Sequence, residues 1–246
     1  MKLLQLNAWM GRLTPQIVSL IQQEQPDIIT AQEVFDVDGP VVFPDNMVNV
    51  FQQIQSAGAF EHTYFSPAWG MEIAHQHATF GNAIFSKFPL EEKETVFTHG
   101  SYNSDLTPGT RVENTRNAQF VRVMAGDKPL WLVNHHAHWE LTPQGSETSV
   151  ARMQIVRDKI ANLPGTKIFA GDFNVLPGTP TLQLFDGMLE DSTDTYKLTT
   201  TLSKFGKVTD VACDHVLVSP EIHVQNFHVL EELVSDHKAL LLEFDI

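Results

Sequence analysis

Carboxylate, amide and imidazole side chains recur directly beside short apolar runs of this sequence. They are Asn7, Glu33, His136, Asp172, Asn174, Asp214, Asp236 and His237. Each apolar run is typical of a buried strand, and the ligands of α/β proteins gather at the ends of strands. Several carboxylates and imidazoles brought together there need a bound cation or a proton to coexist. The spacing therefore predicts one polar site assembled from distant parts of the chain.

Each residue taken alone has a plainer interpretation. Glu33 could be a solvated strand end, and His136 could be a packed or surface histidine. Asp172 and Asn174 could form an Asx-turn, and Asp236 could cap a turn. The joint pattern favours the functional interpretation, because such turns do not usually recur after so many apolar strands in one chain.

Strands and helices must position these side chains, and the chain opens with both. Residues 3–8 read as a strand and residues 27–31 as a buried strand. Between them Thr14 can act as an N-cap and Pro15 suits the first helical position. This β-α-β start is typical of the α/β class.

Further along the chain strands dominate and a hairpin is expected. We predict helices over 45–57 and 146–163, and strands at 83–85, 117–124, 129–135, 167–171, 215–219 and 238–244. The polar stretch 98–114 has the length of an active-site rim. The pattern predicts a single domain over 1–246, with mixed sheets and outer helices.

The charge balance limits the class of partner. Lys and Arg number 16 against 30 for Asp and Glu, so the net charge is 16 − 30 = −14, and 42% of residues are hydrophobic. This excludes wholesale disorder and makes long duplex DNA an unlikely ligand. A local phosphate site stays possible, because a bound dication can supply positive charge. Cys213 is the only cysteine, which excludes an intramolecular disulfide.

The N-terminal apolar run is too short for a signal peptide, and no stretch approaches the roughly 18 apolar residues of a membrane span. We therefore expect a cytoplasmic protein without a membrane span. The sequence does not define the oligomeric state.

Seven short motifs stand in an order that resembles a known family. They are Leu6-Asn7, Gln32-Glu33, Gly81-Asn82-Ala83-Ile84-Phe85-Ser86, Asn134-His135-His136, Gly171-Asp172-Phe173-Asn174, Asp214-His215-Val216-Leu217 and Ser235-Asp236-His237. Their order resembles the endonuclease/exonuclease/phosphatase family, the DNase I-like phosphoesterases. The resemblance implies an α/β (α+β) four-layer sandwich, two packed mixed β-sheets flanked by helices. It also implies divalent-metal-dependent hydrolysis of phosphoesters.

The resemblance gives the motif residues expected roles. Asn7 and Glu33 would bind Mg²⁺, with Mn²⁺ possible, because their hard oxygen atoms suit these ions. Asp236 would join them or fix a metal-bound water. Asp172 would deprotonate the attacking water, and Asn174 would donate to a phosphoryl oxygen.

The two histidines of the motifs would act on the transition state. His136 and His237 would stabilise its charge from two sides by hydrogen bonds. Asp214 would hold the His237 ring and favour its protonated form.

Four further residues are candidates for substrate binding. Arg116 could contact a phosphate or form a surface ion pair, and Trp139 could stack on a flat or apolar part of the substrate. Asn82 belongs to one of the motifs. His138 would share a face with His136 if the strand continues. The two histidines with carboxylates make a transition-metal site an alternative, ranked below Mg²⁺.

Two departures from the family pattern bear on substrate. Many relatives have Ile-Asp-Tyr where this chain has Cys213-Asp214-His215, and no tyrosine here matches the active-site tyrosine of the DNA-repair branch. We expect a phosphodiesterase or phosphatase acting on a small molecule or short oligonucleotide. An endo- or exonuclease is the alternative, and a non-catalytic module that binds a phosphorylated ligand is the second.

Overall fold

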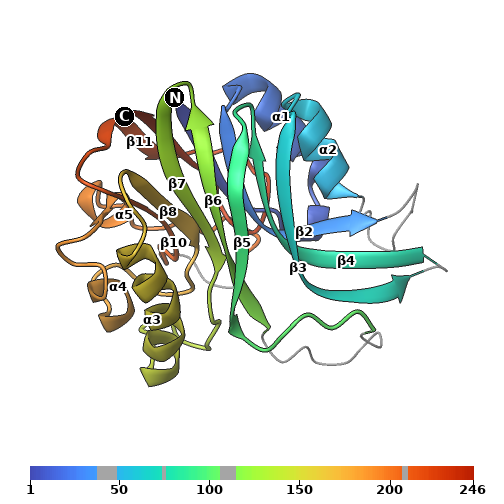
Figure 1. Cartoon of the computed structure of the whole chain (residues 1–246). Helices are drawn as coiled ribbons and strands as arrows, with labels where there is room; N and C mark the ends of the chain where they lie inside the picture. Colours follow the sequence, from blue (N-terminus) through green and yellow to red (C-terminus); the bar gives the residue numbers. More distant parts are fainter. Residues whose placement is uncertain (38–48, 74–75, 106–114, 207–209) are drawn as a thin grey trace.

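Two mixed β-sheets lie face to face in the computed structural model (Figure 1). The structure describes residues 1–37, 49–73, 76–105, 115–206 and 210–246. Within these ranges each sheet has six strands, in the orders β11-β12-β1-β2-β4-β3 and β5-β6-β7-β8-β10-β9. Strand β1 runs parallel to β2, and β7 runs parallel to β8, whereas the other pairings are antiparallel.

The bounds of the strands show which segments make up each sheet. The first sheet contains β1 (Lys2–Asn7), β2 (Ile28–Val37), β3 (His62–Ile73), β4 (Gln76–Ser86), β11 (His223–Val229) and β12 (Leu240–Asp245). The second contains β5 (Leu90–His99), β6 (Arg116–Ala125), β7 (Lys128–His136), β8 (Lys167–Asp172), β9 (Glu190–Asp191) and β10 (Asp214–Val218). The two ends of the chain lie close together (Figure 1), where the Met1 ammonium donates to the Phe244 carbonyl.

Helices cover the outer face of each sheet. The helices are α1 (Thr14–Glu24) and α2 (Val50–Ala57) on the first sheet, and α3 (Glu147–Ala161), α4 (Pro180–Gln183) and α5 (Ser192–Thr195) on the second. Three apolar clusters fill the layers: one under α1 and α2, one between the sheets and one under α3. The predicted four-layer sandwich of two mixed sheets is therefore confirmed.

A buried amide network also crosses from sheet to sheet. Gln32 Nε2 donates to Asn134 Oδ1 at 2.6 Å, and Asn134 Nδ2 donates to Gln119 Oε1 at 2.8 Å. Gln5 Nε2 donates to Gln32 Oε1 at 2.6 Å. These four side chains are fully buried, so their amides depend on one another for hydrogen bonds.

The predicted helix starts were partly right. Thr14 is the first residue of α1 and not its cap, because its hydroxyl donates to the Gly11 carbonyl at 2.6 Å in the short 3-10 turn Trp9–Gly11. Helix α2 begins after Asn49, whose side chain accepts from Gln52 N. The start expected at residue 45 lies outside the described residues. Helix α3 begins after its cap, Ser146, and ends at Ala161, close to the expected bounds of 146 and 163.

Strands β3, β5, β9 and β11 were not predicted. β5 lies at the edge of its sheet and carries mostly exposed, charged side chains in its first half, so it lacks an apolar alternation. β3 contains Pro67 and Gly70, which are depleted in strands. Strand β2 continues to Val37, past the end expected at residue 31. Of the polar stretch expected as a rim, residues 106–114 lie outside the described residues.

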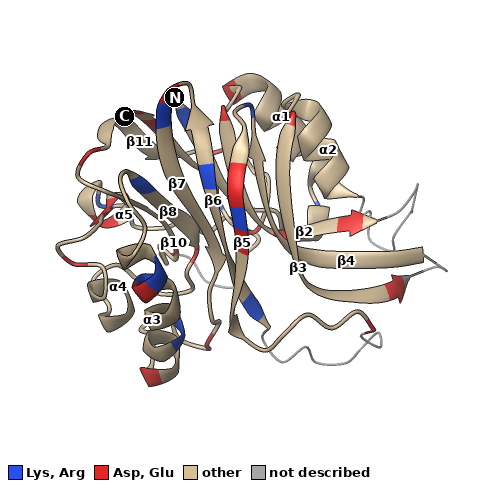
Figure 2. Cartoon of the chain, in the orientation of Figure 1, with Lys and Arg blue, Asp and Glu red and all other residues tan. Residues whose placement is uncertain are grey.

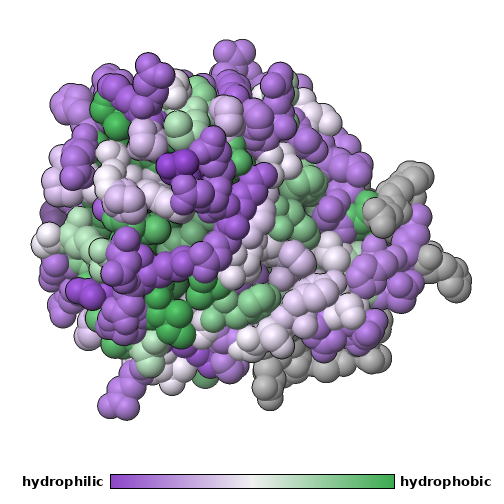
Figure 3. Space-filling view, viewed as in Figure 1, coloured by the Kyte–Doolittle hydropathy of each residue, from purple (hydrophilic) through white to green (hydrophobic). Residues whose placement is uncertain are grey.

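The surface is mixed in charge and polarity. Figure 2 shows Lys and Arg positions dispersed among Asp and Glu positions on both sheets and on the helices. On the face drawn in Figure 3, apolar residues form small patches between hydrophilic ones. None of the helices within the described ranges has the length and apolar character needed to cross a membrane.

Candidate active site

The ends of four strands meet at one edge of the sandwich. Asn7 ends β1, His136 ends β7, Asp172 ends β8 and Asp214 begins β10. Because β10 runs antiparallel to β8 and β7 runs parallel to it, Asp214 and His136 both lie in register with Asp172. A Cβ on Gly171 would lie 1.9 Å from the His135 carbonyl oxygen, so only glycine permits this close approach of β8 to β7.

Asp172 lies at the centre of the cluster. Its Oδ2 accepts from Asn7 Nδ2 at 3.1 Å and lies 3.5 Å from His136 Nε2 and 3.7 Å from His237 Nε2. Its Oδ1 accepts from the Asn174 backbone N–H at 3.1 Å. The Asx-turn is thus present, and it forms part of the cluster instead of replacing it.

Burial raises the pKa of Asp172 to about 6. The positive charge of His237 opposes this shift, whereas the negative charge of Asp214 adds to it. Only 2% of Asp172 is exposed. A buried carboxylate that binds a proton more tightly than usual is suited to take one from water.

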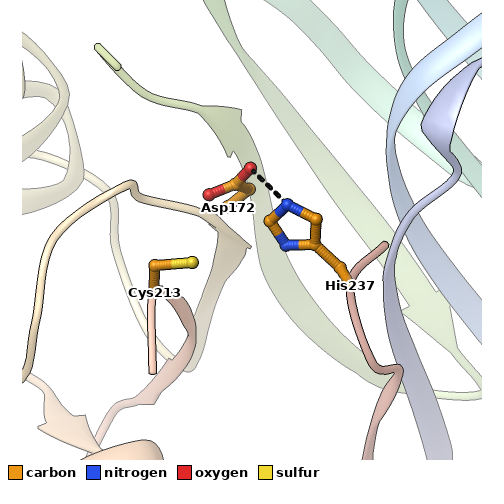
Figure 4. A group of neighbouring side chains, drawn as sticks. All are labelled: Asp172, Cys213 and His237. Carbon is orange, nitrogen blue, oxygen red and sulfur yellow. Dashed lines mark ion pairs between the residues drawn. The ribbon is translucent and has the colours of Figure 1, made fainter. Parts of the chain in front are cut away.

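His237 lies between two carboxylates. Its Nδ1 donates to Asp214 Oδ2 at 2.8 Å, and its other nitrogen faces Asp172 (Figure 4). Burial alone would lower the pKa of His237, but Asp214 and Asp172 outweigh it and hold this pKa well above its usual value. The ring is therefore an imidazolium at neutral pH.

Thr201 holds Asp214 and was missed by the sequence analysis. Its hydroxyl donates to Asp214 Oδ2 at 2.7 Å and accepts from the backbone N–H groups of Cys213 and Asp214. The bridge between Leu202 and His237 brings this segment to the site. No motif marks an isolated threonine, so only the fold identifies it.

Glu33 reaches the site through an irregularity in β2. The pairing of β2 with β4 shifts register between Ala31 and Val34, and Glu33 has φ 52°, which is uncommon for a residue with a side chain. Burial and then the negative charge of Asp236 raise the pKa of Glu33 to about 7. Repulsion between two neighbouring carboxyl groups is typical of a site that binds a cation.

The predicted ligand set fits a hard dication by its chemistry. Asn7, Glu33 and Asp236 offer only oxygen atoms, and Asp236 Oδ1 accepts from Ser235 Oγ at 3.1 Å. Asn7 Oδ1 accepts from the Trp9 backbone N–H at 3.0 Å, which fixes the amide. The ligand roles of these three residues stay predictions.

A second donor set lies beside the first. Asp172, Cys213 and His237 have ligand atoms within 4.8 Å of one another (Figure 4), and no other such group of His, Cys, Asp and Glu occurs in the described part of the chain. Sulfur, nitrogen and oxygen donors together suit zinc better than magnesium. Burial raises the pKa of Cys213 to about 12, so its thiol is protonated. Cys213 was noted in the sequence as a departure from the family pattern but was not among the predicted site residues.

Arg116 lies next to the cluster at the start of β6. Its Nε donates to the Ala137 carbonyl at 2.8 Å, and Asn174 Nδ2 donates to the same oxygen at 3.3 Å. Its positive charge opposes the burial that raises the pKa values of Glu33 and Asp172, so the guanidinium is close to both carboxyl groups. This position suits contact with a phosphate.

The other substrate-binding candidates lie in different surroundings. Asn82 is buried, and its Nδ2 donates to the Asn117 carbonyl at 2.9 Å. Trp139 follows β7 and is 51% exposed. The condition under which His138 would share a face with His136, a strand that continues, is not met, because β7 ends at His136.

His138 turns to helix α3. Its Nδ1 lies 2.6 Å from Arg152 Nη1, and its Nε2 lies 3.4 Å from Glu140 Oε1. The alternative metal site of His136, His138 and carboxylates is therefore not assembled among the described residues.

His215, the departure from the family pattern, points away from the cluster. Its Nδ1 lies 2.9 Å from Asp191 Oδ2, and its Nε2 donates to the Val175 carbonyl at 2.8 Å. The ring stacks on Phe173 with centroids 5.4 Å apart. Burial lowers the pKa of His215, but Asp191 outweighs it and raises this pKa above its usual value.

Comparison with family models decides the family. The model described as the Endonuclease/Exonuclease/phosphatase family matches residues 4–237. The chain belongs to this family. The predicted family is thereby confirmed, and members of this endonuclease/exonuclease/phosphatase family hydrolyse phosphoesters. Comparison with curated protein sequences finds no match.

Solved structures share the family fold at low sequence identity. The protein from Bacteroides vulgatus has 17% identity and a TM-score of 0.75, covering 100% of this chain and 98% of that chain. The mannosyl-6-phosphatase Bt3783 of Bacteroides thetaiotaomicron has 19% identity and a TM-score of 0.69, covering 100% of both chains. TDP2 of D. rerio, humanized by 14 mutations, has 14% identity and a TM-score of 0.72, covering 100% and 99%. At these identities the likeness shows the fold alone.

Proposed function

We propose that this endonuclease/exonuclease/phosphatase protein is a Mg²⁺-dependent phosphoester hydrolase that works by in-line attack of water. The observation that carries the proposal is the position of His237, held by Asp214 at 2.8 Å and facing Asp172 at 3.7 Å. A proton acceptor and a positive hydrogen-bond donor thus lie side by side. In-line displacement at phosphorus needs both, one for the attacking water and one for the charge on the phosphoryl oxygens.

Asp172 is the proposed general base. Its raised pKa of about 6 keeps it ionised at neutral pH while making it a better proton acceptor than an ordinary carboxylate. The hydrogen bonds from Asn7 and from the Asn174 backbone fix its two oxygens. Asn174 is held in turn by the Ala137 carbonyl, and its amide is the proposed donor to a phosphoryl oxygen.

The two histidines have unequal proposed roles. Burial, followed by the positive charge of Arg116, holds the pKa of His136 well below its usual value, so this ring is neutral. His237 carries a positive charge, because Asp214 and Asp172 outweigh its burial. His237 therefore supplies charge to the transition state, and His136 supplies one neutral hydrogen bond.

The oxygen donors Asn7, Glu33 and Asp236 would hold Mg²⁺, with Mn²⁺ as a substitute. When bound, the ion neutralises phosphate charge and assists departure of the leaving oxygen. The raised pKa of Glu33, caused by burial and by Asp236, supports a cation as the missing positive charge.

The substrate is proposed to be small or short. The net charge of −14 and the dispersed basic residues (Figure 2) oppose a long nucleic acid duplex. A phosphodiesterase or phosphatase is favoured over an endo- or exonuclease for this reason. A binding module without catalysis is disfavoured, because the general base and both histidines are in contact distance of one another.

Hydrolysis of bis(p-nitrophenyl) phosphate tests the proposal. We expect turnover with Mg²⁺, loss of turnover with EDTA, and a loss of about 10²–10⁴ in kcat for Asp172→Asn. The exposed Asp186→Asn variant is the matched control and keeps full activity. Phosphate binding without turnover in the unmodified protein would establish the binding module instead.

A further inference from the structure

A group of basic side chains lies on one side of the proposed hydrolytic site. Its members, the basic rim, are His99, Arg116, His138 and Arg152. Two of these side chains register the positive charge of the others: burial and then Arg152 lower the pKa of His138, with smaller contributions from Arg116 and His99, and Arg152 adds to the burial that lowers the pKa of Arg116. Such a concentration of basic side chains is unexpected in a chain with a net charge of −14.

The rim is joined to the hydrolytic site through one residue. Ala137 lies between His136 and His138, and its carbonyl accepts from both Arg116 and Asn174. Its backbone N–H donates to the Asp172 carbonyl at 2.8 Å. A group bound by the rim would therefore be a neighbour of the reacting phosphate.

Arg152 and His138 face each other across the outer part of the rim. Arg152 Nη1 lies 2.6 Å from His138 Nδ1, which requires a neutral ring that accepts from the guanidinium. Glu140 is the carboxylate beside them, with Oε1 3.4 Å from His138 Nε2. That oxygen also accepts from Ser146 Oγ at 2.5 Å, so the same carboxylate oxygen has two polar neighbours, His138 and Ser146.

We propose that Arg152 and His138 form a subsite for a second anionic group of the substrate, a phosphate other than the one that is hydrolysed. The subsite rests on the proposed function, since a second phosphate is defined only relative to the first. A guanidinium offers paired N–H donors that match phosphate oxygens, and an adjacent imidazole adds another donor. Arg116 is close to both Asp172 and His138. Its positive charge would therefore lie between the reacting phosphate and the second phosphate.

This subsite narrows the substrate class. The substrate would be a phosphoester that carries two phosphoryl groups on one small scaffold, such as a nucleoside bisphosphate or a short oligonucleotide with a terminal phosphate. The alternative is a purely structural role, in which Arg152 only fixes the segment of His138 and Glu140. The subsite and the structural role predict opposite effects of removing the Glu140 charge. At an anion subsite the loss of this charge should strengthen binding of the second phosphate, whereas in a structural contact it should loosen the segment.

The test compares thymidine 3′,5′-bisphosphate with thymidine 5′-monophosphate by isothermal titration calorimetry with Mg²⁺, in Asp172→Asn protein to prevent turnover. We expect the bisphosphate to bind about tenfold or more tightly than the monophosphate. Arg152→Gln should abolish this preference and leave monophosphate binding unchanged. Arg157→Gln, on the same helix with a 41% exposed side chain, is the matched control and should keep the preference.

Glu140→Gln keeps an acceptor for Ser146 and should increase the preference. Equal affinity for the two ligands in the parent protein overturns the subsite, as does a preference that survives Arg152→Gln or falls with Glu140→Gln. Should Arg152→Gln not fold, the Glu140→Gln arm still decides. Absence of Mg²⁺-dependent hydrolysis in the unmodified protein would refute the proposed function, which is a separate outcome.

Discussion

His237 donates from Nδ1 to Asp214 Oδ2 at 2.8 Å, across 23 positions of the chain. The Thr201 hydroxyl donates to the same oxygen at 2.7 Å. Thr201 thus holds the Asp214 carboxylate in place, and the carboxylate in turn holds the His237 ring. The pair keeps the second ring nitrogen, Nε2, directed to Asp172. The orientation and the charge of His237 therefore depend on a residue that does not itself need to touch substrate.

Replacing Asp214 should change the pH dependence of catalysis. Asp214 raises the pKa of His237, so the active imidazolium persists to a pH well above 6.5. In Asp214→Asn the alkaline limb of the kcat profile should move to lower pH, and kcat should fall by about 10²-fold or more. A pH–rate profile measures both. An alkaline limb that stays in place would show that Asp214 does not set the charge of His237.

Replacing Asp191 should lower the stability of the protein in a pH-dependent way. Asp191→Asn is also the matched control for the pH–rate profile of Asp214→Asn. Asp191 pairs with buried His215 on the other face of β10 and raises its pKa above 6.5. A raised folded-state pKa gives stabilisation that is fully present below the unfolded value and is lost as pH rises through the folded value. Asp191→Asn should cost about 3 kcal/mol near pH 6 and clearly less near pH 10. Thermal unfolding at the two pH values decides this, while the pH–rate profile should be unchanged.

The affinity for Mg²⁺ should depend on the ionisation of Glu33. Its pKa of about 7 in the metal-free protein means that the ion competes with a proton below neutrality. The apparent affinity should fall by about tenfold per pH unit below 7, and binding should release close to one proton. Calorimetry in buffers of different ionisation enthalpy counts the proton. Glu33→Gln should remove this pH dependence along with most of the affinity, whereas the exposed Glu61→Gln should retain both.

Zinc should inhibit the Mg²⁺-supported reaction through Cys213. The sulfur, nitrogen and oxygen donors of Cys213, His237 and Asp172 lie within 4.8 Å of one another. A zinc ion bound there would occupy His237 and Asp172, which belong to the proposed catalytic cluster. Because the thiol has a pKa of about 12, inhibition should strengthen as pH rises. Cys213→Ser should weaken zinc inhibition by about tenfold or more and leave Mg²⁺-supported turnover intact. Equal inhibition of both proteins would place zinc elsewhere.

The parts of the site that were predictable lie in rigid strand ends. Asp172 follows an apolar run, and the residue before it must be glycine, because a Cβ on Gly171 would lie 1.9 Å from the His135 carbonyl oxygen. One short motif therefore indicates both the strand and the position of the Asp172 side chain. His136 also ends its strand, β7, shortly after the apolar residues Leu130–Val133. In such segments the sequence pattern and the backbone geometry have the same cause.

The remaining parts depend on contacts that no local pattern records. Glu33 points into the site because of a register shift between β2 and β4, which tertiary pairing creates. Thr201 belongs to the site only because the fold brings its hydroxyl within 2.7 Å of Asp214 Oδ2. Arg152 contacts His138 from helix α3. The edge strand β5 was missed because its exposed side chains lack alternation.

The inter-sheet amides have a further consequence. Asn7 and Glu33 belong to one sheet, whereas His136, Asp172 and Asp214 belong to the other. Two apolar faces could shift relative to each other at little cost in free energy, but such a shift would break the hydrogen bond between Gln32 and Asn134. Their hydrogen bond therefore fixes how the two sheets are aligned, and with it the relative positions of the residues that each sheet contributes to the candidate active site.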